Sequence, residues 1–215
     1  MIKTIRFCLP LLFVLVLVAG CKKPDFEPCD NEPNYIPLNT ALVPYIFADS
    51  SQWIYDRSID SLTDTVTLRS AARTVYAWSS RGGTANMTGG CSSYFEEERF
   101  SLFYFSSING GYWQNTRSDE IWLTGNPPGL AFWGGQVGQS RRGVEIEAIH
   151  NSLRVGANSF SNVIQVHTNV GATGEAGIYR FYYCPNIGIV RKEVMYGDSV
   201  HNTYDLVEWH VQPYR

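Results

Sequence analysis

The chain has 215 residues, of which 17 are basic and 20 acidic, and its formal net charge is −3. This mild acidity, without a basic run, argues against nucleic acid as a partner. The 195 residues that follow the first twenty suffice for one sizeable hydrophobic core, so we expect a single folded domain.

The first 21 residues have the layout of an export signal. Lys3 and Arg6 precede an apolar run, residues 7–18, which leads into Val18-Ala19-Gly20-Cys21. The run is shorter than the roughly 20 apolar residues that a bilayer core requires, and Pro10 interrupts it. Such a segment is typical of a cleaved signal.

This layout resembles a bacterial lipoprotein signal. The resemblance implies that residues 1–20 are removed and that Cys21 is the lipid attachment site, with fatty acyl chains such as palmitate. Two or more acyl chains hold a protein firmly on a membrane. An ordinary secretory signal and an uncleaved N-terminal anchor are the alternatives.

The residues after Cys21 bear on location within a cell envelope. In lipoproteins an Asp directly after the lipidated cysteine favours retention in the inner membrane, whereas this chain has Lys22. The resemblance therefore implies the outer membrane. No dense acidic run follows Cys21, which favours the periplasmic face over the cell surface.

Residues 21–44 are predicted to be a tether. Prolines recur there among Asn, Asp and Glu, at positions 24, 28, 33, 37 and 44, and such density favours extended chain. We expect the tether to hold a β domain, residues 45–215, away from the membrane surface.

Three cysteines remain beyond the signal and the lipidated position: Cys29, Cys91 and Cys184. An oxidising compartment permits one disulfide, although spacing does not give the connectivity. We favour Cys91 with Cys184 because both lie in the presumed folded region. Free buried thiols are the alternative. The absence of a C-x-x-C motif or a close Cys/His cluster argues against a metal site.

From Tyr45 the chain breaks into short runs of β-forming residues bounded by turns. A hairpin is expected over residues 52–68, and a longer strand over residues 94–106, with Glu96-Glu97-Glu98 solvated on both faces. After Gly143 strands return, and Val144, Ile146 and Ala148 are expected to share one face of a strand.

Residues 107–143 differ because glycines divide them into short pieces. Three tryptophans and a tyrosine are scattered through this segment: Trp113, Trp122, Trp133 and Tyr112. Tyr and Trp offer flat apolar area with one polar edge, which suits sugar rings, peptides or lipid headgroups. These four residues are our candidate ligand-binding aromatics, and core packing is the competing interpretation.

Strands at this spacing, without a sustained helical period, predict an all-β fold. An antiparallel sandwich and a strongly curved sheet or half-barrel both fit the pattern.

A family resemblance rests on two parts of the chain. They are Trp53-Ile54-Tyr55 with Asp64-Thr65-Val66, and the stretch Tyr182-Tyr183-Cys184-Pro185-Asn186-Ile187-Gly188-Ile189-Val190-Arg191 followed by Trp209. These resemble Bacteroidota lipoproteins with an early W-x-Y hairpin and a late hairpin before a Trp-containing strand. The motifs are structural, and the resemblance implies no catalytic residue. The architecture also has a distant likeness to half-barrel periplasmic lipoprotein carriers.

Patterns that carry chemistry are scarce. The four histidines, His150, His167, His201 and His210, lie far apart without H-E-x-x-H spacing. The segment Gly138-Gln139-Ser140-Arg141-Arg142 lacks the final glycine of a serine-nucleophile motif. Glu145 and Glu147 share a strand face at a spacing that glycosidases use, although an exposed strand gives the same pattern.

We therefore expect a protein that is not an enzyme and needs no metal or cofactor. The leading hypothesis is a membrane-anchored binding or carrier lipoprotein for an apolar or carbohydrate ligand. A structural or assembly lipoprotein that binds another envelope protein is the alternative, and a hydrolase is a remote one.

Overall fold

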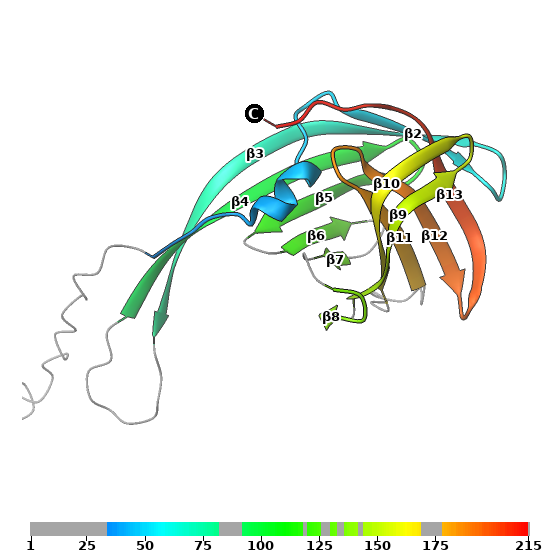
Figure 1. The fold of residues 1–215 in the computed structure, drawn as a ribbon. Coiled ribbons are helices and arrows are strands. Elements are labelled where there is room, and N and C mark those ends of the chain that lie inside the picture. The colour runs from blue at the N-terminus through cyan, green and yellow to red at the C-terminus, as the bar shows by residue number, and fades with distance from the viewer. Residues whose placement is uncertain are drawn as a thin grey trace, which may run out of the picture. The chain divides into compact units, whose positions relative to one another are not determined.

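The computed structural model describes residues 34–81, 92–117, 120–125, 130–132, 136–141, 144–168 and 178–214. They form antiparallel strands and one short 3₁₀ helix (Figure 1). The elements are β1 (Asn34–Ile36), η1 (Thr40–Tyr45), β2 (Gln52–Arg57), β3 (Thr63–Arg81), β4 (Ser92–Ser106), β5 (Gly110–Arg117), β6 (Glu120–Gly125), β7 (Leu130–Phe132), β8 (Ser140–Arg141), β9 (Val144–Val155), β10 (Asn158–Thr168), β11 (Ile178–Cys184), β12 (Gly188–Tyr196) and β13 (Ser199–His210). Within these ranges no helix has the length and hydropathy that crossing a membrane requires.

The contacts divide the chain into two compact units. One unit consists of Tyr35–Ala77 and Glu96–Arg215, and the other of Met1–Asn34 and Trp78–Phe95. In the smaller unit the rings of Trp78 and Phe95 stack at 4.5 Å. The larger unit contains the cavities described below.

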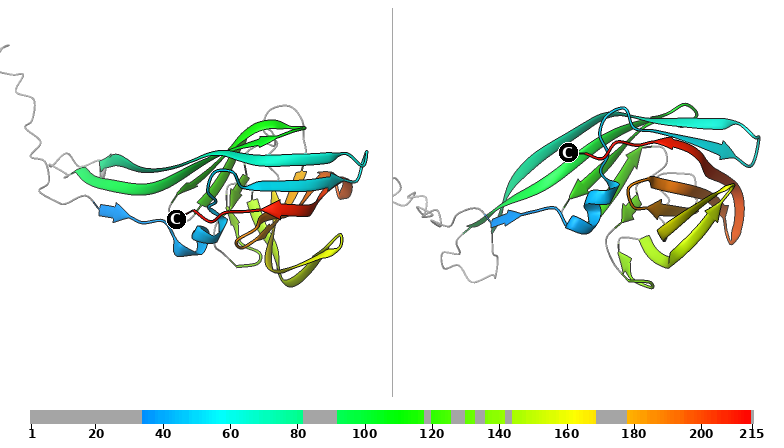
Figure 2. Two further views of the ribbon diagram at one scale, coloured as in Figure 1. Left: turned by 90° about the horizontal axis from the view of Figure 1, so that it is seen from above. Right: turned by 45° about the horizontal axis from the view of Figure 1, so that its top comes forward.

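The strand order shows how the sheet is built from two meanders. Strands β2 to β7 lie side by side in chain order, and so do β8 to β13. The first strand of one meander, β2, pairs with the last strand of the other, β13 (Figure 2). β7 and β9 lie in contact although they stand at opposite ends of this order, so the sheet is curled. The prediction of an all-β fold is confirmed, and of its two forms the half-barrel is correct.

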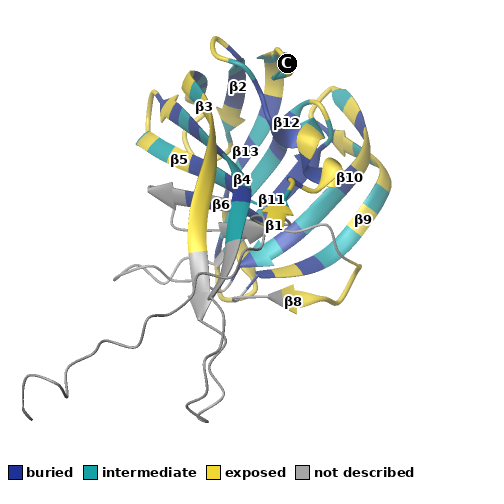
Figure 3. Ribbon diagram, turned by 90° about the vertical axis from the view of Figure 1, so that its left-hand side faces the viewer, coloured by how far each residue is buried: buried dark blue, intermediate teal, exposed yellow. Residues whose placement is uncertain are grey.

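The inner face of the curled sheet carries the hydrophobic core. Residues alternate between the faces along each strand because the side-chain period of a strand is two. On β2, Trp53 and Tyr55 are buried while Gln52 and Ile54 are partly exposed. Figure 3 shows bands of buried, intermediate and exposed residues along β9 and β10, which alternate less regularly.

The expected alternation on β9 stops one residue early. Val144 and Ile146 are buried as predicted, but a β-bulge at Glu147 pairs Val166 with Ile146 and Gln165 with Ala148. A bulge adds one unpaired residue and so reverses the parity beyond it. The prediction that Ala148 shares the face of Ile146 is therefore wrong.

The acidic run on β4 also differs from expectation. Glu97 is only 7% exposed, and its Oε2 accepts hydrogen bonds from the Arg99 Nε and Nη2 atoms at 2.9 and 2.7 Å. Glu98 pairs with Arg73 at 2.7 Å. The predicted solvation of both faces is wrong because arginines replace water around these two carboxylates.

The residues just before position 45 pack against the sheet. β1 pairs with β4, and the η1 segment buries Leu42 fully, with Leu38 8% exposed. The side chain of Asn39 caps η1 by accepting a hydrogen bond from the Ala41 amide at 2.9 Å. The packed structure therefore includes the last part of the segment that we predicted to be a tether.

Candidate functional site

A cavity of about 40 Å³ lies on the inner face of the sheet. Its lining residues are Tyr55, Asp64, Val66, Ser106, Asn109, Tyr112, Leu123, Phe181, Ile189, Lys192 and Tyr204. A second cavity of about 20 Å³ shares Tyr55, Val66, Tyr112, Leu123 and Ile189 with the first. Since one water needs roughly 10–15 Å³, both cavities hold a few waters or one small chemical group.

Aromatic rings form part of the walls of the first cavity and most of those of the second. Tyr104 and Tyr112 stack with ring centroids 5.0 Å apart and planes 7° from parallel. Trp53 lies 5.6 Å from Tyr104 and 5.3 Å from Phe47. Such arrangements contribute beyond the burial of area alone, so they fix the shape of the inner face.

The buried aromatic side chains also have polar partners. The Tyr55 hydroxyl donates to the Ile189 carbonyl at 2.8 Å, and Trp53 Nε1 donates to the Ile187 carbonyl at 2.5 Å. Burial raises the pKa of Tyr55 and Tyr104 well above the usual value of 10, because the phenolate loses its hydration. These phenols therefore stay neutral near physiological pH.

Asp64 supplies a buried carboxylate at the edge of the cavity, and it is 3% exposed. Ser106 Oγ donates to both of its oxygens, at 2.8 and 2.9 Å. Further donors are Ser107 Oγ at 3.2 Å, the Ile108 amide at 3.4 Å and Asn109 Nδ2 at 3.3 Å. All of these donors come from the end of β4 and the following turn, so Asp64 anchors the β4–β5 connection to β3.

Lys192 on β12 faces the same cavity. Its cross-strand partners are Phe181 on β11 and Tyr204 on β13. Its Nζ atom lies 4.3 Å from the centroid of the Tyr204 ring and 6.0 Å from that of Tyr179. Within the described part of the chain, this ammonium has no hydrogen-bond or ion-pair partner. Burial lowers the pKa of Lys192 to about 8, although Asp64 acts in the opposite direction.

A second cation stands beside Tyr204. The guanidinium carbon of Arg57 lies 5.4 Å from the centroid of the Tyr204 ring. Arg57 also forms an ion pair with Asp60 at 3.2 Å. Its charge is thus partly neutralised, and it helps to lower the pKa of Lys192.

The structure separates the aromatic residues that we expected to act together. Tyr112 lines both cavities, whereas its neighbour Trp113 is 43% exposed and contacts Phe103, with centroids 4.8 Å apart. Adjacent residues of a strand point to opposite faces, so these two cannot line one surface. Trp122 lies on β6, where it pairs with Asn115, and Trp133 lies outside the described residues. A ligand-binding role for any of the four stays a prediction.

Of the cysteines, Cys184 alone falls within the described residues, and its thiol is buried. Its Sγ atom lies 3.5 Å from the Ser161 carbonyl oxygen, and burial raises the pKa of the thiol. Cys21 and Cys91 lie outside the described residues, so lipid attachment and the disulfide stay predictions.

Of the acidic pair on β9, Glu147 belongs to a network on the other face of the sheet. Glu147 accepts from Arg180 Nε and Gln165 Nε2, each at 2.6 Å, and Arg180 also donates to Glu193 at 3.1 Å. Burial raises the pKa of Glu147, but hydrogen bonds from Arg180 and Gln165 outweigh it and lower the pKa. Glu145 is exposed outside this network. A lowered pKa suits an ion pair and not a general acid.

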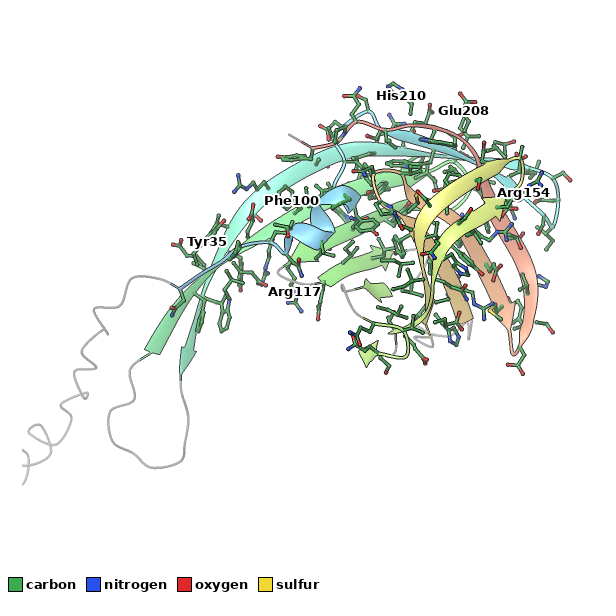
Figure 4. The ribbon with its side chains drawn as sticks, viewed as in Figure 1. Tyr35, Phe100, Arg117, Arg154, Glu208 and His210 are labelled. Carbon is green, nitrogen blue, oxygen red and sulfur yellow. The ribbon has the colours of Figure 1, made fainter. Side chains whose placement is uncertain are left out.

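The histidines do not converge. His201 and His210 are both exposed on β13, and Figure 4 shows His210 projecting away from the sheet near Glu208. His150 contacts Gln165 at 2.7 Å and His167 lies 3.6 Å from Glu147. Within the described ranges, no group of three or more His, Cys, Asp or Glu side chains is placed to hold a metal.

Sequence reasoning missed the residues that give the cavity its polar character, Asp64 and Lys192. One signal was present: Lys192 is the only lysine after Lys23, in a chain that otherwise uses arginine for its positive charges. Lysine tolerates loss of its charge on burial far better than arginine does. A single lysine inside a strand, between Arg191 and Glu193, is therefore the signal that sequence reasoning passed over.

Comparison with known proteins gives little further information. Neither a protein-family model nor a curated protein sequence matches the chain. Solved structures that resemble it include a candidate lipoprotein of Parabacteroides distasonis ATCC 8503, with 10% identity, TM-score 0.42, and coverage of 78% of this chain and 98% of that one. Another is a candidate exported protein with a YmcC-like fold from Bacteroides fragilis NCTC 9343, with 11% identity, TM-score 0.44, and coverage of 77% and 98%. Likeness at this level supports no conclusion about the present chain.

Proposed function

We propose that this protein is a lipid-anchored, non-catalytic binding protein of the cell envelope that holds a small apolar or carbohydrate ligand inside its curled sheet. The observation that carries the proposal is the inner cavity, where tyrosine rings surround an ammonium without a partner among the described residues. Ligand sites typically combine apolar and aromatic walls with a few convergent polar groups. In this proposal the ligand contacts the inner face, and the exposed ring of Trp113 takes no part in binding.

The anchor is proposed from the sequence alone. The Val18-Ala19-Gly20-Cys21 pattern and the prolines that follow it support a β domain held outside the membrane by a short tether. Lys22 after the lipidated cysteine favours the outer membrane. Mass spectrometry of the N-terminal peptide from the native host tests this: we expect a chain beginning at acylated Cys21. An unmodified N-terminus on a soluble protein would contradict the proposal, and a Cys21→Ser variant serves as the control.

Binding is tested by the fluorescence of Trp53, which lines the second cavity. A panel of apolar compounds and short glycans is titrated against the full chain. We expect a saturable change with at least one class. A Trp113→Phe variant leaves the inner face intact and removes an exposed fluorophore, so the change must persist in it. No saturable response from any compound would oppose the proposal.

The assembly role is a second candidate because the outer face carries exposed aromatic residues. Phe105 and Trp113 are 45% and 43% exposed, and Phe103 packs against Trp113. An apolar patch of this kind is enriched at protein interfaces. Quantitative pull-down from solubilised envelopes, with wild type and a Phe105→Ser, Trp113→Ser variant, tests this role. A stoichiometric envelope partner that the variant loses supports it, and identical recovery with both opposes it.

A further inference from the structure

Asp64 and Lys192 face one cavity, but they differ in how their polar atoms are used. Both oxygens of Asp64 accept hydrogen bonds from residues 106–109. Lys192 has the face of Tyr204 beside it and, within the described residues, no acceptor for its three N–H groups. Lys192 is partly buried, and withdrawing an ammonium from bulk water without supplying an acceptor costs free energy in proportion to the water contacts that are lost. A ligand in this cavity would therefore supply a hydrogen-bond acceptor for Lys192, whereas the Asp64 oxygens already have their donors.

The charges around the cavity define which acceptor fits. The groups that face Lys192 are Asp64 on β3, Arg57 on β2, Tyr204 on β13 and Tyr179 on β11, with Tyr55 and Tyr112 across the cavity. Arg57 is already paired with Asp60. Lys192 is then the cation of this set without an ion-pair partner among the described residues, while the nearby Asp64 carboxylate already offsets part of its charge and repels further negative charge. A monoanion is favoured over a dianion such as a phosphate monoester.

We propose that Lys192 binds the carboxylate of a monoanionic ligand whose apolar body occupies the aromatic part of the inner face. This inference rests on the proposed binding function and names its ligand class. The carboxylate fits the cavity of about 40 Å³. Tyr55, Val66, Tyr112, Leu123 and Ile189 line both this cavity and the second one, so the two are neighbours, and the body of the ligand requires them to open into one space.

The proposal is tested on the full chain by NMR with biosynthetically ¹³C,¹⁵N-labelled lysine. Lys192 is distinguished from Lys22 and Lys23 by comparison with a Lys192→Arg variant. Benzoate and hexanoate are the carboxylate probes, benzyl alcohol and hexanol their neutral counterparts, and phenyl phosphate the dianion. We expect the carboxylates to shift the Lys192 signals and to raise its pKa, because an opposite charge stabilises the ammonium. The alcohols should bind more weakly and leave that pKa unchanged.

A charge-neutral variant gives the affinity test. Lys192→Met keeps most of the side-chain volume, so we expect benzoate affinity to fall at least tenfold while benzyl alcohol affinity changes less than twofold. Arg191→Met is the matched control: it removes a positive charge one residue away, in an ion pair with Asp205. We expect it to leave both affinities within twofold.

The wild-type protein alone provides a second test that does not depend on the folding of a variant. The ammonium of Lys192 is deprotonated above its pKa of about 8. Benzoate affinity should therefore fall about tenfold per pH unit above pH 8, whereas benzyl alcohol affinity should stay constant to pH 9.5.

The possible results distinguish failure of the Lys192 role from failure of the binding function. Binding of alcohols and carboxylates alike, with unchanged Lys192 signals, would overturn the role of Lys192 and leave the binding function standing. Preference for phenyl phosphate over benzoate would overturn the monoanion class. No binding of any probe or of the wider panel would overturn the binding function itself.

Discussion

The hydroxyl of Tyr55 donates a hydrogen bond of 2.8 Å to the carbonyl of Ile189, 134 residues away in the chain. The two residues lie on β2 and β12, which are separated in the sheet by β13. The Ile189 carbonyl lies beside a bulge, where the β11–β12 register shifts past Val190. A side chain of the first meander thus forms a hydrogen bond across β13 with the backbone of the second meander. Both residues line the cavities.

Replacement of Tyr55 by Phe should test the value of this contact. The variant leaves the partly buried Ile189 carbonyl without its donor, which costs about 1 kcal/mol of unfolding free energy. Urea denaturation measures the difference. Tyr196→Phe is the control, because Tyr196 is 56% exposed and its loss should cost less than about 0.5 kcal/mol. Equal stability of the two variants would mean that the Tyr55 bond contributes nothing.

The buried tyrosines predict a sharp loss of stability at high pH. Burial raises the pKa of Tyr45, Tyr55, Tyr104, Tyr112 and Tyr183 above 10. The unfolded chain loses these protons near pH 10 while the folded chain keeps them, so stability falls as the pH rises above 10. Absorbance at 295 nm should show these phenols ionising only together with unfolding. A smooth titration in a chain that stays folded would contradict their burial.

Titration of Lys192 predicts the opposite trend, a stability that rises with pH, in a lower pH range. Its pKa is about 8 in the folded chain and about 10.4 in the unfolded one, so the unfolded chain holds more protons between these values. Stability contributed by this group therefore rises from pH 8 to pH 10. We expect Lys192→Met to be more stable than wild type at pH 7 and to lose most of that advantage by pH 9.5. Thermal unfolding at both pH values measures this, and a destabilised variant at pH 7 would show that Lys192 already has a partner.

The network on the other face should respond to acid. The pKa of Glu147 is lowered by Arg180 and Gln165, so its stabilising effect is present above about pH 4.5 and is lost as the pH falls through the folded value. An Arg180→Met variant should be less stable than wild type at pH 7, by roughly 1 kcal/mol for a partly exposed pair. The two proteins should converge near pH 3. A constant difference across this range would assign the effect of Arg180 to packing.

The fold could be predicted because its signals are local. Alternation in residues 52–55 and 144–146, and turns at glycines, identified the strands. The wrong predictions concern residues whose exposure depends on the neighbouring strand. The bulge at Glu147 depends on the register with β10, and the burial of Glu97 depends on Arg99 and its surroundings. Neither is visible in the period of a single strand.

The candidate site was less predictable for the same reason. The cavity combines residues from eight strands and a turn, and no short motif contains them. Aromatic enrichment in residues 107–143 singled out Tyr112, which lines both cavities, but it could not show which face Tyr112 shares with its neighbours. Asp64 and Lys192 come together only because β2 pairs with β13, which places the start of β3 across the inner face from β12.

The central claim is that the inner cavity holds a ligand, and native mass spectrometry of protein purified from its own envelope tests it most directly. Leu123 lines both cavities and is 1% exposed, so Leu123→Trp should fill them, with Val66→Phe as a second filling variant and unfolding curves as the check on folding. The account predicts a small molecule bound at one copy per chain in the wild type and absent from the folded variants. A bare mass for the wild type, together with no added mass after incubation with the panel compounds, would contradict it.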